Sequence, residues 1–173
     1  PCFVKANKAG SSFGVTKVYS KADLPNAIAT AFKEDDELII ESFLEGTEVS
    51  VGVIRYKGKV TVLPITEIVT ENDFFDYEAK YLGKSQEITP ARLSDTQEAA
   101  VRETAESIYT ILKLDGFSRS EFIFKEGKPH FLEINTIPGL TKESILPQQA
   151  AQAGISLPDL FDNAIQEALQ KNS

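Results

Sequence analysis

Residues 131–144 read Phe-Leu-Glu-Ile-Asn-Thr-Ile-Pro-Gly-Leu-Thr-Lys-Glu-Ser, and this stretch decides how the rest of the chain is interpreted. Its apolar residues are typical of a β-strand. Glu133 and Asn135 stand two residues apart, so both side chains point to one face of that strand. Such a pair suits a hard cation such as Mg²⁺, but a strand with one solvent-facing side shows the same pattern. Pro138 and Gly139 end the strand.

The residues before this stretch predict a partner strand. A strand over 119–125 is joined by the Glu126-Gly127 turn to the strand over 129–135, so the two should pair antiparallel. Arg119 and Glu121 share one face by the same two-residue spacing. The hairpin therefore brings three oxygen ligands and an arginine into one neighbourhood, which favours the metal interpretation.

A helix predicted over 144–153 follows the turn, with Gly154 at its end. Its first backbone amides and the Ser144 hydroxyl should point back toward Glu133. The N-terminal end of a helix favours a carboxylate ligand. A closing helix is predicted over 158–169, and a longer one begins at the Ser94–Gln97 capping box and continues to about Leu112.

The N-terminal residues predict a strand, a flexible loop and a second strand, with small residues from Gly10 to Ser12 and with Gly14 closing the loop. Backbone amides in such a loop bind phosphate oxygens when a lysine lies nearby. The spacing is not that of a P-loop, and a plain glycine hairpin remains the alternative. A helix beginning at Ser20 follows.

Two further regions contain candidate site residues. Glu41, Glu45 and Glu48 bracket a connector between strands, where they are either surface acids or acceptors for a nucleotide's amino and ribose hydroxyl groups. Residues 72–90 form a polar segment too long for a simple connector, which indicates a functional lid or disorder. Its four aromatic residues argue against disorder, and a lid would exclude water from a reactive phosphate.

Composition narrows the class of protein. A net charge of −8 over 173 residues argues against nonspecific binding to nucleic acid or acidic membranes. No apolar run approaches the length of a membrane span. One cysteine and one histidine, His130, provide no basis for a zinc site or a Cys-His nucleophile. The chain contains no methionine and starts as if inside a strand, so we expect a fragment.

Three motifs in this order resemble the D-alanine–D-alanine ligases of the ATP-grasp superfamily. Phe-Val-Lys followed by Gly-Ser-Ser-Phe-Gly-Val is similar to that family's phosphate-loop hairpin. Asp-Tyr-Glu-Ala-Lys-Tyr is similar to its omega loop, and Leu-Glu-Ile-Asn-Thr-Ile-Pro-Gly-Leu-Thr to its metal and substrate signature. The resemblance covers essentially the whole chain. It implies an α/β ATP-grasp fold of mostly antiparallel sheets flanked by helices, with part of the small subdomain at 1–45 and the large subdomain at 46–173.

The resemblance also implies ATP and two Mg²⁺ ions, with Mn²⁺ as a substitute. Glu121, Glu133 and Asn135 would hold the metal. The nucleotide would contact residues distributed along the chain: Lys5, Gly10, Ser11, Ser12, Glu41, Phe43, Leu44, Glu48 and Lys80. Tyr81 would pair with Ser11 to tie the omega loop (about 72–90) over the site. Arg119 and the Gly139 amide would stabilise the oxyanion, and Ser144 with the Ile145 amide would bind the second D-alanine.

The chain departs from the family pattern at Glu121, where aspartate is more common, and in lacking the N-terminal region. We therefore expect this chain alone to be inactive, and the intact enzyme to be a cytoplasmic bacterial homodimer acting on D-alanine for peptidoglycan synthesis. One alternative is a D-alanine–D-lactate ligase, against which Tyr81 argues. A non-catalytic nucleotide-binding fragment is the other.

Overall fold

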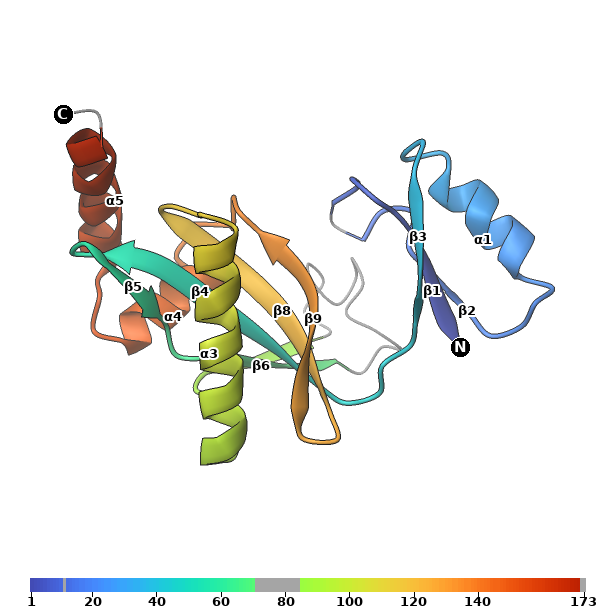
Figure 1. Ribbon diagram of the computed structural model, residues 1–173, viewed down its shortest axis with the longest axis horizontal. Helices are drawn as coiled ribbons and strands as arrows, with labels where there is room; N and C mark the ends of the chain where they lie inside the picture. Colours follow the sequence, from blue (N-terminus) through green and yellow to red (C-terminus); the bar gives the residue numbers. More distant parts are fainter. Residues whose placement is uncertain (11, 71–84, 172–173) are drawn as a thin grey trace. The chain divides into compact units, whose positions relative to one another are not determined.

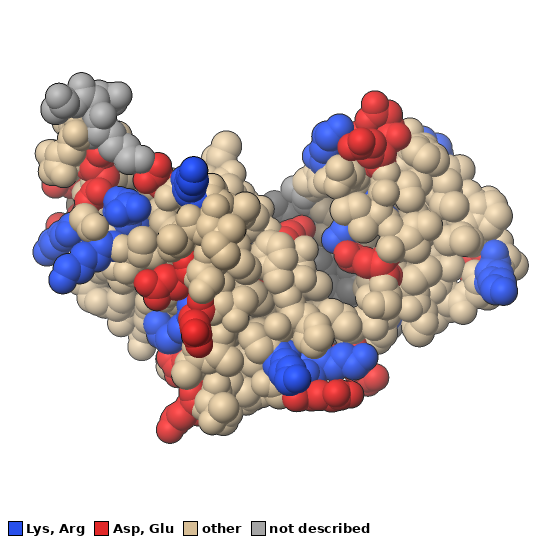
Figure 2. Space-filling model, in the orientation of Figure 1, with Lys and Arg blue, Asp and Glu red and all other residues tan. Residues whose placement is uncertain are grey.

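The computed structural model describes residues 1–10, 12–70 and 85–171. The chain divides into two compact units: unit 1 comprises Pro1–Leu44 with Thr70–Ser85, and unit 2 comprises Glu45–Val69 with Gln86–Ser173. Within the described part, no helix has both the length and the apolar character needed to cross a membrane. On the face shown in Figure 2, acidic and basic side chains are interspersed.

Unit 1 is a three-stranded antiparallel sheet covered on one face by a helix. Its elements are β1 (Cys2–Ala6), β2 (Thr16–Val18), α1 (Leu24–Ala31) and β3 (Leu38–Ser42), and the strand order is β2-β1-β3. Four buried residues form the core between α1 and the sheet: Val4, Val18, Ala27 and Ala31. The helix begins later than predicted, because the Ser20 hydroxyl donates to Asp23 Oδ2 at 2.8 Å and Asp23 occupies the N-cap position.

Unit 2 contains a larger sheet with strand order β7-β6-β4-β8-β9, in which β5 also pairs with β4 (Figure 1). Its strands are β4 (Thr47–Tyr56), β5 (Lys59–Val62), β6 (Thr66–Thr70), β7 (Ser85–Ile88), β8 (Phe117–Lys125) and β9 (Lys128–Asn135). Its helices are α3 (Asp95–Ile111), α4 (Ile145–Gln152) and α5 (Leu157–Lys171). The strand pairs with a determined register are all antiparallel, which confirms the predicted mixed α/β class with antiparallel sheets.

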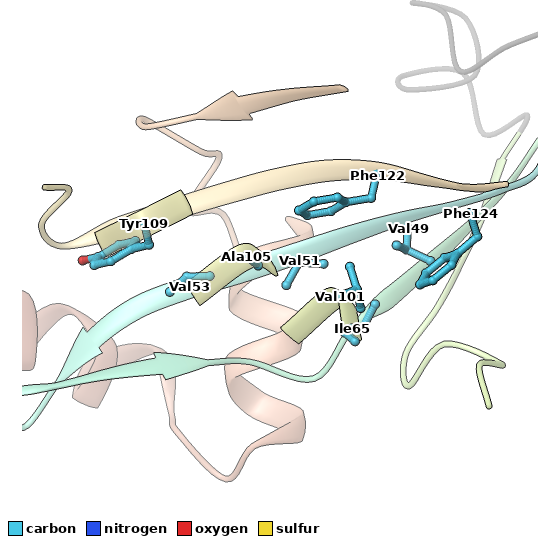
Figure 3. Packing of buried hydrophobic residues seen from close by; sticks show 9 residues of the cluster. All are labelled: Val49, Val51, Val53, Ile65, Val101, Ala105, Tyr109, Phe122 and Phe124. Atoms are coloured by element: carbon cyan, nitrogen blue, oxygen red, sulfur yellow. The ribbon is translucent and has the colours of Figure 1, made fainter. Parts of the chain in front are cut away.

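Helix α3 packs on one face of this sheet and buries the larger core of unit 2 (Figure 3). Val49, Val51 and Val53 alternate along β4 and meet the apolar side of α3 at Val101 and Ala105. The helix starts as predicted, because Ser94 Oγ accepts from the Gln97 amide while the Gln97 side chain accepts from the Ser94 amide. A reciprocal cap of this kind satisfies two backbone donors at once.

Helices α4 and α5 pack with the residues of β4 that point to the opposite face. Ile54 packs there with Leu63, Leu146 and Leu160. Ser50 lies four residues before Ile54 on β4, so it points to the same face near the other end of the strand. The candidate site lies on this face, on the part formed by β4, β8 and β9.

The predicted loop over 72–90 is wrong at its C-terminal end, because residues 85–88 form β7 and pair with β6. A strand of four residues with mixed polarity carries too weak a periodic signal to be distinguished from loop by sequence alone. The earlier part of that segment, 72–84, lies outside the described residues.

Candidate functional site

The predicted hairpin of β8 and β9 exists, and its register brings four candidate residues together. Glu121 stands opposite Glu133, and Arg119 stands opposite Asn135. Directly opposed residues of an antiparallel pair share a face, so all four side chains project from the same side of the sheet. The predicted pairing of these two strands is therefore confirmed, whereas the roles of the residues remain predictions.

A bulge in β9 makes this register possible. Phe122 pairs with Phe131, but the preceding residue, Glu121, pairs with Glu133, so Leu132 is an extra residue in β9. Phe131 therefore packs edge-on against Phe122 at 5.8 Å between ring centroids, while Glu133 faces Glu121. Without the bulge, Phe131 and Glu133 would share one face, because side chains alternate along a strand.

Glu121 is the buried centre of this cluster, with its side chain only 9% exposed. Its Oε1 accepts from Arg119 Nε at 2.7 Å and from the Ser50 hydroxyl at 3.2 Å. Its Oε2 is buried and has no hydrogen-bond partner among the described residues. Burial raises the pKa of the Glu121 carboxyl, against the opposing effect of the Arg119 guanidinium. A buried carboxylate oxygen without a partner is costly, which makes Oε2 a natural ligand atom for a cation.

The surrounding residues fit a hard divalent cation with oxygen ligands. Glu133 is exposed opposite Glu121, and half-buried Asn135 uses one lone pair of Oδ1 to accept from the Ile137 amide at 2.9 Å. The second lone pair of that oxygen remains for a ligand. In the described part of the chain, no three His, Cys, Asp or Glu residues come close enough to hold a metal, so Asn135 would have to complete the set.

The turn after β9 brings Gly139 and Ser144 together. A Cβ on Gly139 would lie 2.8 Å from Ser144 Oγ, so a larger residue there would displace the Ser144 hydroxyl. Ser144 holds the N-cap position of α4, yet its side chain accepts no bond from the helix amides. Its hydroxyl instead lies 2.8 Å from Thr141 Oγ1. Ile145, the first residue of α4, has a buried side chain. The Ser144 side chain therefore does not cap the first amides of α4.

In unit 1, Lys5, Glu41 and Phe43 lie on the side of the sheet that α1 does not cover. Lys5 Nζ forms an ion pair with Glu41 Oε1 at 2.8 Å, a contact that sequence reasoning missed. Phe43 lies 6.1 Å from Phe3 between ring centroids, and Lys17 Nζ lies 4.0 Å from the Phe43 centroid. Charged groups and aromatic rings on one face are the groups that bind a nucleotide.

The loop between β1 and β2 consists of successive tight turns. The Phe13 amide donates to the Gly10 carbonyl at 3.1 Å, and the Val15 amide donates to the Ser12 carbonyl at 3.3 Å. Ser12 has φ = +60° and Gly14 has φ = +70°. Both the phosphate-loop and the plain-hairpin interpretations are compatible with this geometry.

The remaining predicted residues are scattered. Leu44 is half-buried at the end of unit 1, and Glu48 is half-buried near the start of β4 in unit 2. Ser11, Lys80 and Tyr81 lie outside the described residues, as does the predicted Ser11–Tyr81 pairing.

Three polar residues of unit 2, on the sheet face that carries Glu121, were not predicted from the sequence. Ser50 binds Glu121, and Gln149 is fully buried with its amide against β4. Glu87 lies on β7, where burial raises the pKa of its carboxyl and Arg119 opposes that effect. The polar alternation along residues 49–55 was the one available signal for Ser50. Glu87 was hidden in a segment interpreted as loop.

Comparison with known proteins places these residues in a family context. The family model described as "D-ala D-ala ligase C-terminus" matches residues 1–166. The D-alanine–D-alanine ligase of Flavobacterium johnsoniae is 69% identical over 169 residues, which cover 98% of this chain and 52% of that protein. The ligase of Christiangramia forsetii is 66% identical over 171 residues, with 99% and 52% covered. This chain spans about half the length of these relatives.

Solved structures of ligases also superpose on most of this chain. The VanG D-Ala:D-Ser ligase of Enterococcus faecalis superposes with a TM-score of 0.83 at 37% identity, covering 96% of this chain and 49% of that one. The D-alanine–D-alanine ligase of Bacillus anthracis complexed with ATP superposes with a TM-score of 0.81 at 31% identity, covering 98% and 53%.

Proposed function

Because this chain belongs to the D-ala D-ala ligase C-terminus family, we propose that it carries the nucleotide- and metal-binding half of an enzyme that joins two D-alanines at the expense of ATP. The observation that carries this proposal is the buried Glu121 carboxyl, which has one oxygen held by Arg119 and Ser50 and the other without a partner. Its position opposite Glu133 supports a cation site rather than a structural ion pair.

Glu121, Glu133 and Asn135 would hold Mg²⁺, or Mn²⁺ in its place, and the family pattern implies two ions. Bound Mg²⁺ supplies positive charge that neutralises the phosphate oxygens of ATP during phosphoryl transfer. Arg119 lies beside Glu121 and, with the Gly139 amide, would stabilise the oxyanion that forms when an amine attacks an acyl phosphate. Glutamate at position 121 reaches further than aspartate, which suits its buried origin on β8.

The nucleotide would bind through the residues that the family pattern implies. Lys5 would contact phosphate, and the residues Gly10, Ser11 and Ser12 would cover it. Glu41 would accept from the adenine amino group beside Phe43 and Leu44, and Glu48 would bind the ribose. Lys80 and Tyr81 would close over the phosphates. The ATP complex of the Bacillus anthracis relative supports a nucleotide in this family. The Lys5–Glu41 ion pair would have to open, or share its charge with the ligand.

The second D-alanine would bind at the start of α4. Its carboxylate would accept from the Ser144 hydroxyl and the Ile145 amide, which lie where the helix dipole favours negative charge. Ser144 is suited to this because it does not cap its own helix. The amine would then be directed toward the acyl phosphate. We expect the protein to act in the bacterial cytoplasm as a homodimer, in peptidoglycan precursor synthesis.

The test uses a fusion protein in which the N-terminal half of the Flavobacterium johnsoniae ligase precedes this chain, with that intact ligase as the positive control. D-Alanine, D-serine and D-lactate are offered as second substrates, with release of ADP and product mass as the measurements. We expect D-alanyl-D-alanine from the fusion protein and no turnover from this chain alone. A depsipeptide or D-alanyl-D-serine product would correct the substrate. A folded fusion protein that binds ATP without turnover would favour a non-catalytic nucleotide-binding role.

A further inference from the structure

The edge of β4 that faces β5 and β6 is interrupted in the middle. β5 pairs with Val53–Tyr56, and β6 pairs with Glu48–Ser50. Gly52 lies between these two ladders, where its carbonyl accepts from the Leu63 amide at 2.9 Å. Its amide lies inside the molecule, and a buried backbone donor requires an acceptor.

The side chain of Gln149, from α4, fills this gap. Its Oε1 accepts from the Gly52 amide at 3.0 Å, and its Nε2 donates to the Ser50 carbonyl at 2.9 Å and to Thr66 Oγ1 at 3.0 Å. Gln149 is fully buried, and both N–H groups and the oxygen of its amide are used. The side chain thus replaces a missing peptide unit of a neighbouring strand.

The absence of a side chain on Gly52 makes this contact possible. A Cβ at that position would overlap Gln149 Oε1 and would lie 3.1 Å from Leu63 Cδ1. The glycine allows the amide of Gln149 to approach the backbone of β4 closely, which is a recognised use of glycine inside a strand.

Gln149 is connected to both halves of the candidate site in unit 2. Through Ser50, whose hydroxyl donates to Glu121 Oε1, it fixes the strand that supports the metal-binding carboxylates. Through α4, it fixes the helix that begins one residue after Ser144. Five residues separate Gln149 from Ser144, which corresponds to about 7.5 Å along a helix. One side chain therefore ties the position of α4 to the position of Glu121.

We propose that Gln149 is a positioning residue, which holds the metal-binding carboxylate Glu121 and the substrate-binding end of α4 at Ser144 in a fixed relation. The reaction that it serves rests on the function proposed above, whereas the geometric link between β4 and α4 does not.

The geometric link is tested on this chain by NMR. Gln149→Met keeps the length of the side chain and removes its hydrogen bonds, and Gln149→Glu keeps the acceptor for the Gly52 amide if the methionine variant fails to fold. Gln152→Met is the matched control, because Gln152 is an exposed glutamine at the far end of the same helix. We expect the amide resonances of Glu121 and Ser144 to shift together in the Gln149 variants and to stay in place in the control.

The consequence for the reaction is tested on the fusion protein by steady-state kinetics. Loss of a residue that supports binding groups typically costs roughly tenfold in affinity or activity. We expect Gln149→Met to raise both the Mg²⁺ requirement and the KM for the second D-alanine by roughly tenfold. Gln152→Met should change neither value.

The NMR and kinetic experiments distinguish the role of Gln149 from the proposed function. Unmoved resonances of Glu121 and Ser144 in a folded Gln149 variant would overturn the inference. So would shifted resonances with both kinetic constants unchanged in an active fusion protein, because Gln149 would then be a purely structural residue. An inactive unsubstituted fusion protein would count against the proposed function, and the NMR arm would still decide the role of Gln149.

Discussion

At the scale of single residues, the burial of Glu121 destabilises the fold but provides an oxygen that can bind a cation. Its carboxyl is buried, and one oxygen has no hydrogen-bond partner among the described residues. The Arg119 guanidinium offsets only part of the burial, since the net effect on the pKa of Glu121 is still upward. A divalent cation at Oε2 would relieve both the unpaired oxygen and the like charge of Glu133 opposite. Metal binding at Glu121 would therefore stabilise the folded chain.

Mn²⁺ should therefore stabilise this chain against heat. A ligand that binds only the folded state raises stability by about 2.7 kcal/mol at a concentration of one hundred times its Kd. We expect differential scanning fluorimetry to show a higher Tm with Mn²⁺ for the unsubstituted chain and no such rise for Glu133→Gln. Glu143→Gln, which changes an exposed acid in the turn after β9, is the control. An equal rise in all three proteins would show that the metal binds elsewhere.

Ser144→Ala should weaken the binding of the second D-alanine without weakening the binding of ATP. A hydrogen bond to a charged group contributes about 1.5–3 kcal/mol, so we expect the KM of that substrate in the fusion protein to rise roughly tenfold or more. Ser156→Ala is a crossed control, because Ser156 Oγ accepts from the Asp159 amide at 3.2 Å and caps α5. It should lower Tm and leave the KM unchanged. The assignment of Ser144 fails if the two serines behave alike.

At the scale of elements, local signals predicted the parts whose cause is local. The capping box at Ser94 and the Glu126-Gly127 turn determine their own structures within a few residues, and both are present. The bulge at Leu132 and the gap that Gln149 fills depend on which strands happen to be neighbours. No periodicity within β9 or α4 contains that information. The pairing of the strands that carry Glu121 and Glu133 was therefore predictable, whereas the bulge at Leu132 and the contact of Gln149 were not.

The Glu67–Arg92 pair joins β6 to the segment that follows β7, and it should make stability depend on pH. The Arg92 guanidinium lowers the pKa of Glu67, and it donates to both carboxylate oxygens, at 2.8 Å and 2.7 Å. Because the pKa is lower in the folded state, the unfolded chain binds this proton more readily. The stabilisation is complete above the ordinary glutamate value of about 4.3 and is lost as the pH falls through the lowered pKa.

Urea unfolding of Arg92→Gln measures this contribution. We expect a lower free energy of unfolding at neutral pH, since the Glu67 carboxylate loses its partner. The difference from the unsubstituted chain should shrink as the pH is lowered below about 4. Glu98→Gln, which removes the exposed pair with Arg102 on α3, should change stability by no more than about 0.5 kcal/mol. A loss for Arg92→Gln that does not vary with pH would contradict the role of Glu67.

At the scale of the whole molecule, the order of the motifs predicted the family because each motif combines a fold element with its chemistry. The phosphate-loop hairpin and the Glu133–Asn135 strand lie in different units, yet they were interpreted as parts of one enzyme from sequence alone. The family match over residues 1–166 confirms that interpretation at the level of the family. The roles of the individual residues stay predictions.

The two units should differ in stability, because their cores differ in size. Among the described residues, unit 1 contains one cluster of four buried apolar residues, whereas unit 2 contains clusters of nine and six. Buried apolar area supplies most of the stabilisation of a fold, and units with small cores open at lower free energy. Hydrogen exchange followed by NMR should therefore show weaker protection at Val4 in β1 than at Val51 in β4.

Val18→Ala and Val53→Ala are matched truncations of buried valines, each costing about 1–3 kcal/mol. Each should lower protection mainly in its own unit. Equal protection in both units, lowered equally by either variant, would show that the chain unfolds as one cooperative body.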